Sequence, residues 1–382
     1  MVNVFHINSN YLTSRLHENL VEKLENKGIH NTIYMPVKKE TIDEFLYESR
    51  FDVKAPVTFK DRDKFIFTWK QHKIIRKMEE LYDFKTIDII HAHTLFTDGN
   101  VAHYLSEKYD IPYVVTVRGM TDIDGFFKKR INLRARGRRI LKDASRIVFL
   151  SEANKQTLLS EYIKNDRTAL QKKSKVIPNG IDDFWFEHEY RPKEMRSDKS
   201  VDLLYVGKLK KSKNAPSVVE AMRILKDKYD IEANATFIGK IVDQDIHDEL
   251  AAVEDVPVKL LPPAGKDVLL DLYRNSDIFI MPSYSETFGL VYPEAMSQGL
   301  PVIYSKGQGF DGQFQYGQVG FPVDPYEPED IADRLADIIK DYKTISTNAI
   351  EKYKLFNWQT ISEEHKENYA KVLQDRKEAN ID

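Results

Sequence analysis

The stretch "DIFIMPSYSETFGLVYPEAMSQGLPVIY", residues 277–304, contains two apolar runs that are separated by a helical segment. Residues 278–281 and 301–304 are short and apolar, as expected of buried strands. Residues 290–298 between them predict a helix, because Gly299 supplies a C-terminal stop. A strand, a helix and a second strand in this order are typical of a parallel sheet that is covered by helices.

The same alternation of apolar runs and helical segments extends over most of the chain. The first series of predicted strands comprises residues 2–7, 31–35, 87–91, 113–117, 146–150 and 175–177. The second series comprises residues 202–206, 234–238, 258–261, 278–281 and 301–304. The polar segment 179–200 between the two series begins with the turn pair Asn179-Gly180, and we interpret it as a linker. The fold class is therefore α/β, with one parallel sheet in each of two domains.

Composition restricts the kind of protein. A chain of 382 residues is longer than one ordinary core needs, and 42% hydrophobic residues are too many for a disordered chain. The net charge of -3 argues against a general nucleic-acid binder, although residues 128–146 are basic. The absence of cysteine excludes disulfides and fits a reducing compartment. The first residues lack a signal-peptide pattern and no apolar run is long enough to span a membrane, so we expect a cytoplasmic protein.

Two glutamates, Glu286 and Glu294, stand on either side of the predicted start of the helix after residues 278–281. Ligands of open parallel sheets bind outside the carboxyl ends of the strands, so this loop is where a ligand is expected. A helix N-terminus favours an anion such as phosphate, whereas carboxylates suit neighbouring hydroxyl groups. The pattern therefore indicates a phosphate flanked by two polyols, which is the layout of a sugar nucleotide. Spacing alone leaves another reading open, in which Glu286 is a solvated loop residue and Glu294 stabilises the helix dipole.

The stretch resembles the E-x7-E motif of retaining glycosyltransferases of the GT-B fold, family 4. Further segments resemble the same family in the same order: "KVIPNGID" (175–182), "YVGKLKKSKN" (205–214), "GLPVIYSKGQGFDG" (299–312), "QVGFPVDPYEPEDIADRLADII" (318–339) and "FNWQTISEEHKENYAKVL" (356–373). The resemblance implies two Rossmann-like domains that face each other across a cleft. Residues 1–182 would form the acceptor-side domain and 183–358 the donor-binding domain. Residues 359–382 would form a C-terminal helix that crosses back to the first domain.

The resemblance also implies roles for single residues. Glu294 would bind the ribose hydroxyls, and Glu286 would hold a hydroxyl of the donor sugar, helped by the N–H groups of Phe288 and Gly289. The lysines Lys208 and Lys213 would lie on the diphosphate. Where this chain has Lys208 the family usually has arginine, and lysine keeps the charge but loses the bidentate fork. The other donor-binding residues that the resemblance implies are Gly207 and Leu290.

The first domain departs from the family pattern at Arg118, where many relatives carry histidine. Arg118 could act on a phosphate or on an anionic acceptor, or it could form a structural ion pair. The residues His93 and Asn179 are expected to line the cleft. His91 and His93 would share one face of a strand, but the sequence shows no third metal ligand. We therefore expect neither a metal nor another cofactor.

The expected reaction is transfer of a sugar from a nucleotide-sugar donor, with UDP as the guessed nucleotide, to the hydroxyl of a glycan or lipid-linked acceptor. The resemblance implies hexosyl or N-acetylhexosaminyl transfer with retention, in the synthesis of cell-envelope or exported glycans. Two alternatives remain open. One is a sugar-nucleotide epimerase of the same fold, which would turn over without an acceptor. The other is a non-catalytic sugar-nucleotide-binding protein.

The basic segment 126–146, "FFKKRINLRARGRRILKDASR", predicts where the enzyme works. As a helix it would place an apolar face inward and a basic face outward; the apolar face comprises Leu133, Ile140, Leu141 and Ala144. The basic face is either simply solvated or a surface for anionic lipid. We expect the pair Phe126-Phe127 to be exposed and able to insert at a membrane interface. The segment therefore predicts peripheral attachment to the inner face of the membrane.

Overall fold

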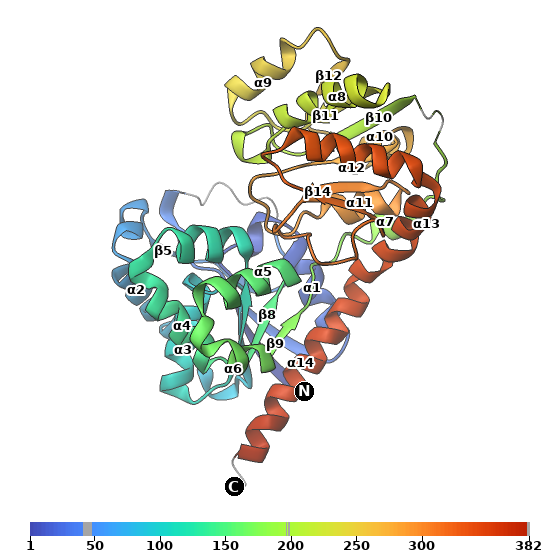
Figure 1. Ribbon diagram of the computed structural model, residues 1–382. Coiled ribbons are helices and arrows are strands. Elements are labelled where there is room, and N and C mark those ends of the chain that lie inside the picture. The colour runs from blue at the N-terminus through green and yellow to red at the C-terminus, as the bar shows by residue number, and fades with distance from the viewer. Residues whose placement is uncertain (41–47, 196, 198, 380–382) are drawn as a thin grey trace. The chain divides into compact units, whose positions relative to one another are not determined.

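The computed structural model describes residues 1–40, 48–195, 197 and 199–379 (Figure 1). The chain divides into two units. Unit 1 consists of Met1–Gly180 and the C-terminal segment from Trp358, and unit 2 consists of Ile181–Asn357. In the structure the chain passes from one unit to the other after Gly180 and after Asn357. The boundaries predicted from sequence, after residues 182 and 358, differ from these positions by two residues and by one residue.

Unit 1 is built on a seven-stranded sheet in which all pairings are parallel. In spatial order the strands are β4 (Val53–Lys54), β2 (Ile29–Tyr34), β1 (Val2–Ile7), β6 (Ile89–Ala92), β7 (Tyr113–Val117), β8 (Arg146–Phe149) and β9 (Ser174–Val176). Every residue of β6 and of β7 is buried, because helices cover both faces of the sheet. The short strands β3 (Val37–Lys38) and β5 (Val57–Phe59) form a separate pair.

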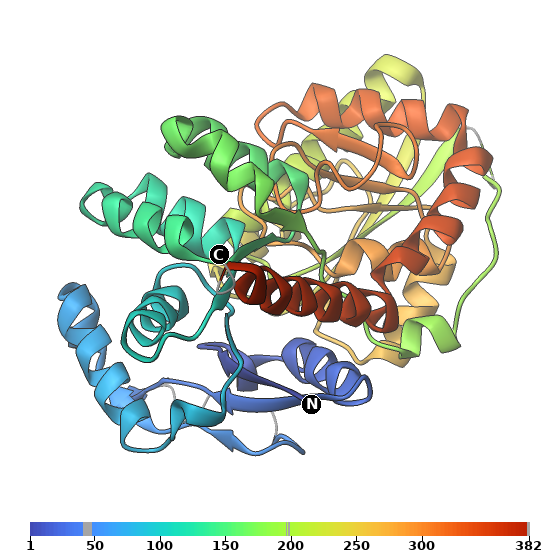
Figure 2. The same cartoon turned by 90° about the horizontal axis from the view of Figure 1, so that it is seen from below.

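The helices of unit 1 are α1 (Leu16–Glu25), α2 (Phe67–Glu79), α3 (Thr97–Tyr109), α4 (Arg134–Asp143), α5 (Glu152–Thr157), α6 (Arg167–Lys172) and α14 (Trp358–Ala379). The last helix, α14, lies beside α1, and the two pack on the same face of the sheet (Figure 2). Four of its residues, Trp358, Ile361, Tyr369 and Val372, join the core that contains Val4, Val114 and Val148. The C-terminal helix therefore completes a core that the first residues of the chain begin.

Unit 2 has a six-stranded sheet that is also parallel throughout. Its order is β12 (Val258–Leu261), β11 (Glu232–Ile238), β10 (Ser200–Val206), β13 (Ile278–Ile280), β14 (Val302–Ser305) and β15 (Gly320–Val323). Its helices are α7 (Phe184–Glu187), α8 (Pro216–Tyr229), α9 (Gln244–Ala251), α10 (Lys266–Asn275), α11 (Val291–Ser297), α12 (Pro328–Lys340) and α13 (Tyr342–Lys352). The two sheets confirm the predicted α/β class.

The interpretation of residues 179–200 as a linker is wrong for its middle part. Trp185 of α7 is buried, and its ring lies edge-on to Tyr273 at 5.5 Å. The Tyr190 N–H donates to the Ser297 carbonyl at 3.0 Å. The reason is an aromatic cluster within an otherwise polar stretch, which packs this part of the segment into unit 2.

Within the described residues, no helix combines the length and the apolarity that crossing a membrane requires.

Candidate active site

An ion pair at the carboxyl ends of neighbouring strands joins two of the predicted catalytic residues. Lys213 follows β10 in the turn Lys211–Lys213, and Glu286 lies in the loop after β13. Since β10 and β13 are paired in the sheet, their following loops meet, and the Lys213 ammonium bonds the Glu286 carboxylate. The side chains are only 16% and 13% exposed, so solvent screens this pair less than a surface pair. The structure thus brings one cation and one carboxylate to the edge of the sheet where ligands bind.

The loop that carries Glu286 is held by a second loop, which follows β14. The Glu286 N–H donates to Oε1 of Gln308 at 2.9 Å, and the Gly309 N–H donates to the Glu286 carbonyl at 3.3 Å. A Cβ at Gly309 would lie 2.1 Å from the Thr287 carbonyl oxygen, so only glycine permits this approach. The Thr287 N–H donates to Oε1 of Glu286 at 2.9 Å. The carboxylate is therefore oriented before any substrate arrives.

Phe288 and Gly289 contribute through their backbone. The Phe288 side chain is buried between the rings of Phe310 and Phe356, at 6.2 and 5.7 Å. Gly289 has a φ of +85°, and a Cβ there would lie 2.3 Å from the Tyr292 ring. Both residues therefore fix the path of the loop, while their predicted contact with the donor sugar depends on their N–H groups.

The second glutamate, Glu294, has different neighbours from Glu286. It lies in α11, where burial raises the pKa of its carboxyl group to about 8, and the nearby Asp182 raises that pKa as well. Lys266, which pairs with Asp182 at 2.5 Å, opposes this rise. The indole of Trp185 and the hydroxyl of Tyr273 also oppose it, although neither makes a hydrogen bond of ordinary geometry. The raised pKa favours the protonated form of this carboxyl group, which can both donate to and accept from hydroxyl groups.

Replacing Glu294 with alanine is expected to weaken nucleotide binding, because it removes the group with this double hydrogen-bonding capacity. Loss of hydrogen bonds to a partly buried polar group typically costs about 1–3 kcal/mol, which corresponds to roughly 5- to 150-fold in Kd. Isothermal titration with UDP measures the change. Glu249→Ala, at an exposed position in α9, is the matched control. Unchanged UDP affinity in Glu294→Ala would remove this residue from the site.

The other predicted donor-binding residues lie around the same strand ends. Lys208 is exposed and lies two residues after the end of β10. Among the described residues, the lysine that pairs with Glu286 is Lys213 and not Lys208. Gly207 is in close contact with Gly239, since a Cβ at Gly239 would lie 1.8 Å from the Gly207 carbonyl oxygen. Leu290 is half-buried and precedes α11. Because α11 has only seven residues, the predicted phosphate site would depend on the lysines more than on the helix dipole.

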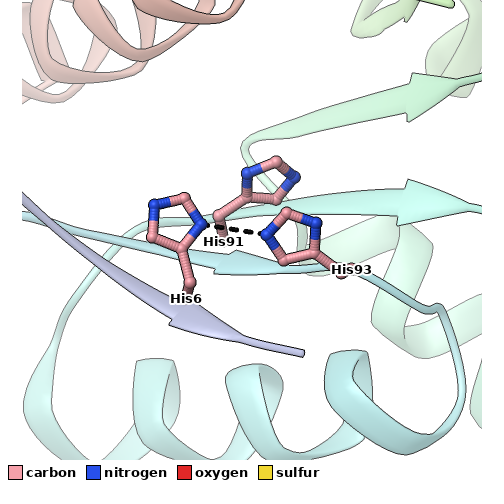
Figure 3. Close-up of side chains that lie close together, drawn as sticks. All are labelled: His6, His91 and His93. Atoms are coloured by element: carbon pink, nitrogen blue, oxygen red, sulfur yellow. Dashed lines mark hydrogen bonds between the residues drawn. The ribbon is translucent and has the colours of Figure 1, made fainter. Parts of the chain in front are cut away.

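Unit 1 presents a different polar group at the carboxyl ends of its strands, a cluster of buried histidines. His6 from β1 and His93 after β6 share a hydrogen bond of 2.9 Å between Nδ1 and Nε2, as Figure 3 shows. The Asn31 Oδ1 lies 2.9 Å from Nε2 of His6. Because that oxygen can only accept, Nε2 of His6 carries the proton and Nδ1 accepts from His93. The ring of His91 stacks on His93 at 4.1 Å.

The expectation that no third potential metal ligand accompanies His91 and His93 is wrong. The nitrogens of His6, His91 and His93 lie within 4.8 Å of one another. Three neutral imidazoles suit zinc. The surroundings oppose a cation, because the buried Arg118 guanidinium donates to the His93 carbonyl at 2.8 Å. A metal would also replace the bond between His6 and His93, so we assign no metal to the cluster.

The chain matches two family models over almost its whole length. Residues 14–183 match the model described as Glycosyltransferase Family 4, and residues 186–354 match the model described as Glycosyl transferases group 1. This chain belongs to the group 1 glycosyltransferases of the GT-B fold.

Individual proteins also resemble this glycosyltransferase, at 19% to 29% sequence identity. The D-inositol 3-phosphate glycosyltransferase of Paenarthrobacter aurescens is 29% identical over 306 residues, which cover 75% of this chain and 73% of that protein. The sucrose-phosphate synthase of Thermosynechococcus elongatus has a TM-score of 0.75 at 19% identity, covering 98% of this chain and 100% of that one. The Anabaena protein HepE, solved with UDP and glucose, has a TM-score of 0.67 at 19% identity, covering 97% and 100%. These structures confirm the GT-B fold.

In the glycosyltransferase, the remaining predicted site residues belong to unit 1. Arg118, His93 and Asn179 line one small cavity together with His17 and His365. His17 and His365 were missed because single histidines far apart in the sequence carry no motif. Nε2 of His17 lies 3.4 Å from the Arg118 guanidinium.

The basic segment 126–146 is only partly as predicted. Leu133, Ile140, Leu141 and Ala144 are buried and form the inner face of this segment, as expected. The expectation of an exposed Phe126-Phe127 pair is wrong. Phe127 is fully buried, and Phe126 stacks on Phe96 at 4.4 Å. The reason is that Gly119–Lys128 form a π-helical segment, in which both rings pack against Phe96.

Proposed function

We propose that this glycosyltransferase moves a sugar from a UDP-sugar to an acceptor hydroxyl with retention of the anomeric configuration. The observation that supports the proposal best is the Lys213–Glu286 ion pair in unit 2, which offers a cation for a diphosphate beside a carboxylate for sugar hydroxyls. The likeness to HepE, which was solved with UDP and glucose, supports UDP as the nucleotide. A hexose or N-acetylhexosamine is the class of sugar that we propose.

The proposed reaction needs no covalent intermediate with the enzyme. The bond between the anomeric carbon and the diphosphate oxygen breaks while the acceptor oxygen forms its bond on the same face. The acceptor proton passes to the departing phosphate oxygen. Lys213 stabilises the charge that develops on the diphosphate, and Glu286 orients a hydroxyl of the donor sugar.

A screen of sugar nucleotides tests the proposal. Purified protein is incubated with UDP- and GDP-linked hexoses and N-acetylhexosamines, each with and without a mixture of glycan and lipid-linked acceptors. NMR spectroscopy of the product reads the anomeric configuration. We expect transfer from a UDP-sugar with retention. An inverted product would contradict the retaining mechanism, and conversion of the sugar nucleotide without any acceptor would instead indicate an epimerase.

We further propose that the enzyme attaches to anionic membranes and acts in the synthesis of envelope glycans. Exposed basic residues of segment 126–146 include Lys128, Lys129, Arg130, Arg138 and Arg139. In place of the buried phenylalanines, nearby apolar side chains are exposed: Ile131 by 70%, Ile66 by 64% and Trp69 by 56%. The start of α2 adjoins the basic segment, since Arg136 donates to the Thr68 hydroxyl at 3.3 Å. Basic and apolar side chains together are typical of an interfacial surface.

Co-sedimentation with vesicles is expected to retain more protein on anionic than on neutral lipid, and less at high salt. Each basic residue near an anionic bilayer contributes about 1 kcal/mol. Replacing Lys128, Arg138 and Arg139 with alanine should therefore abolish most of the retention. A triple variant at the exposed α8 and α9 positions Glu220, Asp245 and Glu249 is the control. Equal retention on neutral and anionic vesicles would refute the attachment.

A further inference from the structure

Arg118 is a buried cation without an ion-pair partner. Its side chain is 7% exposed, and its Nε donates to the His93 carbonyl. Among the described residues, no carboxylate forms an ion pair with its guanidinium, and its other side-chain neighbour is the neutral His17. A guanidinium stays charged in proteins, and buried charges are normally paired. An uncompensated one inside a functional unit therefore indicates that its counter-ion comes from a ligand.

The nearest acidic residues are engaged elsewhere. The Asp122 carboxylate accepts the backbone N–H groups of Arg118, Leu95 and Phe96, at 2.8, 3.0 and 3.4 Å. Asp98 accepts the hydroxyl and the N–H of Ser9. Both carboxylates act on Arg118 only from a distance, and burial raises the pKa of Asp122 to about 7. The raised pKa favours the neutral form of Asp122, and neither carboxylate forms an ion pair with the Arg118 guanidinium, so the charge of Arg118 is balanced only in part.

The cavity beside Arg118 is lined by polar and apolar side chains, and its polar ones include possible hydrogen-bond donors. Among the described residues, none of its lining side chains is an aspartate or a glutamate. Two buried lining atoms have no hydrogen-bond partner, the indole Nε1 of Trp358 and the Nδ1 of His365. The indole N–H can only donate. The cavity volume is about 10 Å³, which is room for one oxygen atom of a larger group.

We propose that Arg118, with this cavity, forms a subsite for an oxyanion of the sugar substrate, a carboxylate or a phosphate. One oxygen of that group enters the cavity and bonds the guanidinium. The inference rests on the proposed transfer reaction and deepens it, because it states that one of the two substrates carries a negative charge besides the diphosphate of the donor. The charge sits either on the donor sugar, as a uronate, or on the acceptor, as a phosphate.

Matched substrate pairs test the subsite and identify the source of the charge. One pair is UDP-glucose and UDP-glucuronate, and the other is a sugar acceptor with and without a phosphate group. We expect the wild type to prefer the charged member of one pair. Arg118→Gln should lower kcat/KM for that member by about 10²-fold and leave the neutral member within a few-fold, since truncating one partner of a buried charge pair typically costs that much. Arg118→Lys should restore part of the loss.

The controls separate this inference from the proposed function. Arg76→Gln removes an exposed arginine of unit 1 and should change neither preference. Hydrogen exchange of β7 in unit 1 at the wild-type level verifies that the unit carrying Arg118→Gln folds. In addition, phosphate should raise the Tm of the wild type when UDP already occupies unit 2, and the Tm of the variant much less. A wild type without any transfer refutes the proposed function. A wild type that transfers without charge preference, or a variant that loses both members equally, refutes the subsite.

Discussion

Replacing Lys213 with alanine is expected to lower kcat by about 10²–10³-fold. A pre-organised charge that acts on the developing charge of the leaving group has an effect of this size. The same change leaves the Glu286 carboxylate without its partner in the site, so orientation of the donor sugar should suffer as well. Steady-state kinetics with the donor found in the sugar-nucleotide screen measures the loss. Lys211→Ala, at the exposed position two residues earlier, should keep nearly full activity.

The Lys213 prediction includes insensitivity to metal chelators. If Lys213 supplies the positive charge for the diphosphate, a chelator should change the rate by less than about two-fold, in contrast to enzymes that hold Mg²⁺ on the substrate phosphates. Loss of activity with a chelator and its recovery with Mg²⁺ or Mn²⁺ would assign that role to a metal. Full activity in Lys213→Ala would show that Lys213 does not have this role.

Acidification from pH 7 to pH 5 is expected to destabilise unit 1 but not unit 2, because protonation of the buried Glu294, whose pKa is raised to about 8, favours the folded state of unit 2. Burial lowers the pKa of His6 to about 4 and that of His365 to about 3, whereas an unfolded histidine titrates near 6.5. The unfolded state therefore binds more protons below pH 6.5, and stability is lost as the pH falls from 6.5 toward the folded pKa values. At pH 5 each of these two histidines removes about 2 kcal/mol. His17, His91 and His93 have lowered pKa values as well, so the loss is larger. The buried Asp98 and Asp122, whose pKa values are raised to about 6 and about 7, oppose this loss but do not cancel that of five histidines.

Hydrogen exchange measured by peptide can follow the two units separately. Between pH 7 and pH 5, after correction for the intrinsic rate, protection should fall more in β7 of unit 1 than in β14 of unit 2. Protection in β7 can be expressed as a free energy of opening. His6→Gln should reduce the dependence of this free energy on pH by about 1.4 kcal/mol per pH unit. His30→Gln, which removes an exposed histidine of the same unit, should leave it unchanged. Equal loss of protection in both units would show that the cluster is not the cause.

The elements that sequence predicts best are strands rich in apolar and β-branched side chains. β1, β7 and β12 have the predicted bounds, although β1 includes His6 and β12 includes the exposed Lys259. The two-residue strands β3 and β4 were missed because so few residues produce no pattern. The closing strand β15 contains Gly320 and Pro322, and only the family resemblance indicated it.

The sequence predicts those residues of the candidate site that belong to a motif. It does not predict the residues that only tertiary packing brings together. Glu286 and Lys213 were identified one by one, but their ion pair spans 73 residues and required the strand order. The histidine cluster draws on positions from 6 to 365, which no local spacing connects. The phenylalanines of segment 126–146 were misjudged because hydrophobic periodicity does not include a π-helical turn.

The placement of α14 in unit 1 has a consequence for biosynthesis. A ribosome that makes this chain releases the first 180 residues, then the whole of unit 2, and only then the helix that starts at Trp358. Until that moment the sheet face around Val4, Val114 and Val148 lacks its cover, and His91 lacks the Tyr369 hydroxyl at 2.7 Å. Unit 2 can therefore mature before α14 is made, whereas unit 1 remains an open nascent intermediate with an apolar face until α14 has been synthesised. The synthesis of α14 is thus the step that closes the core of unit 1.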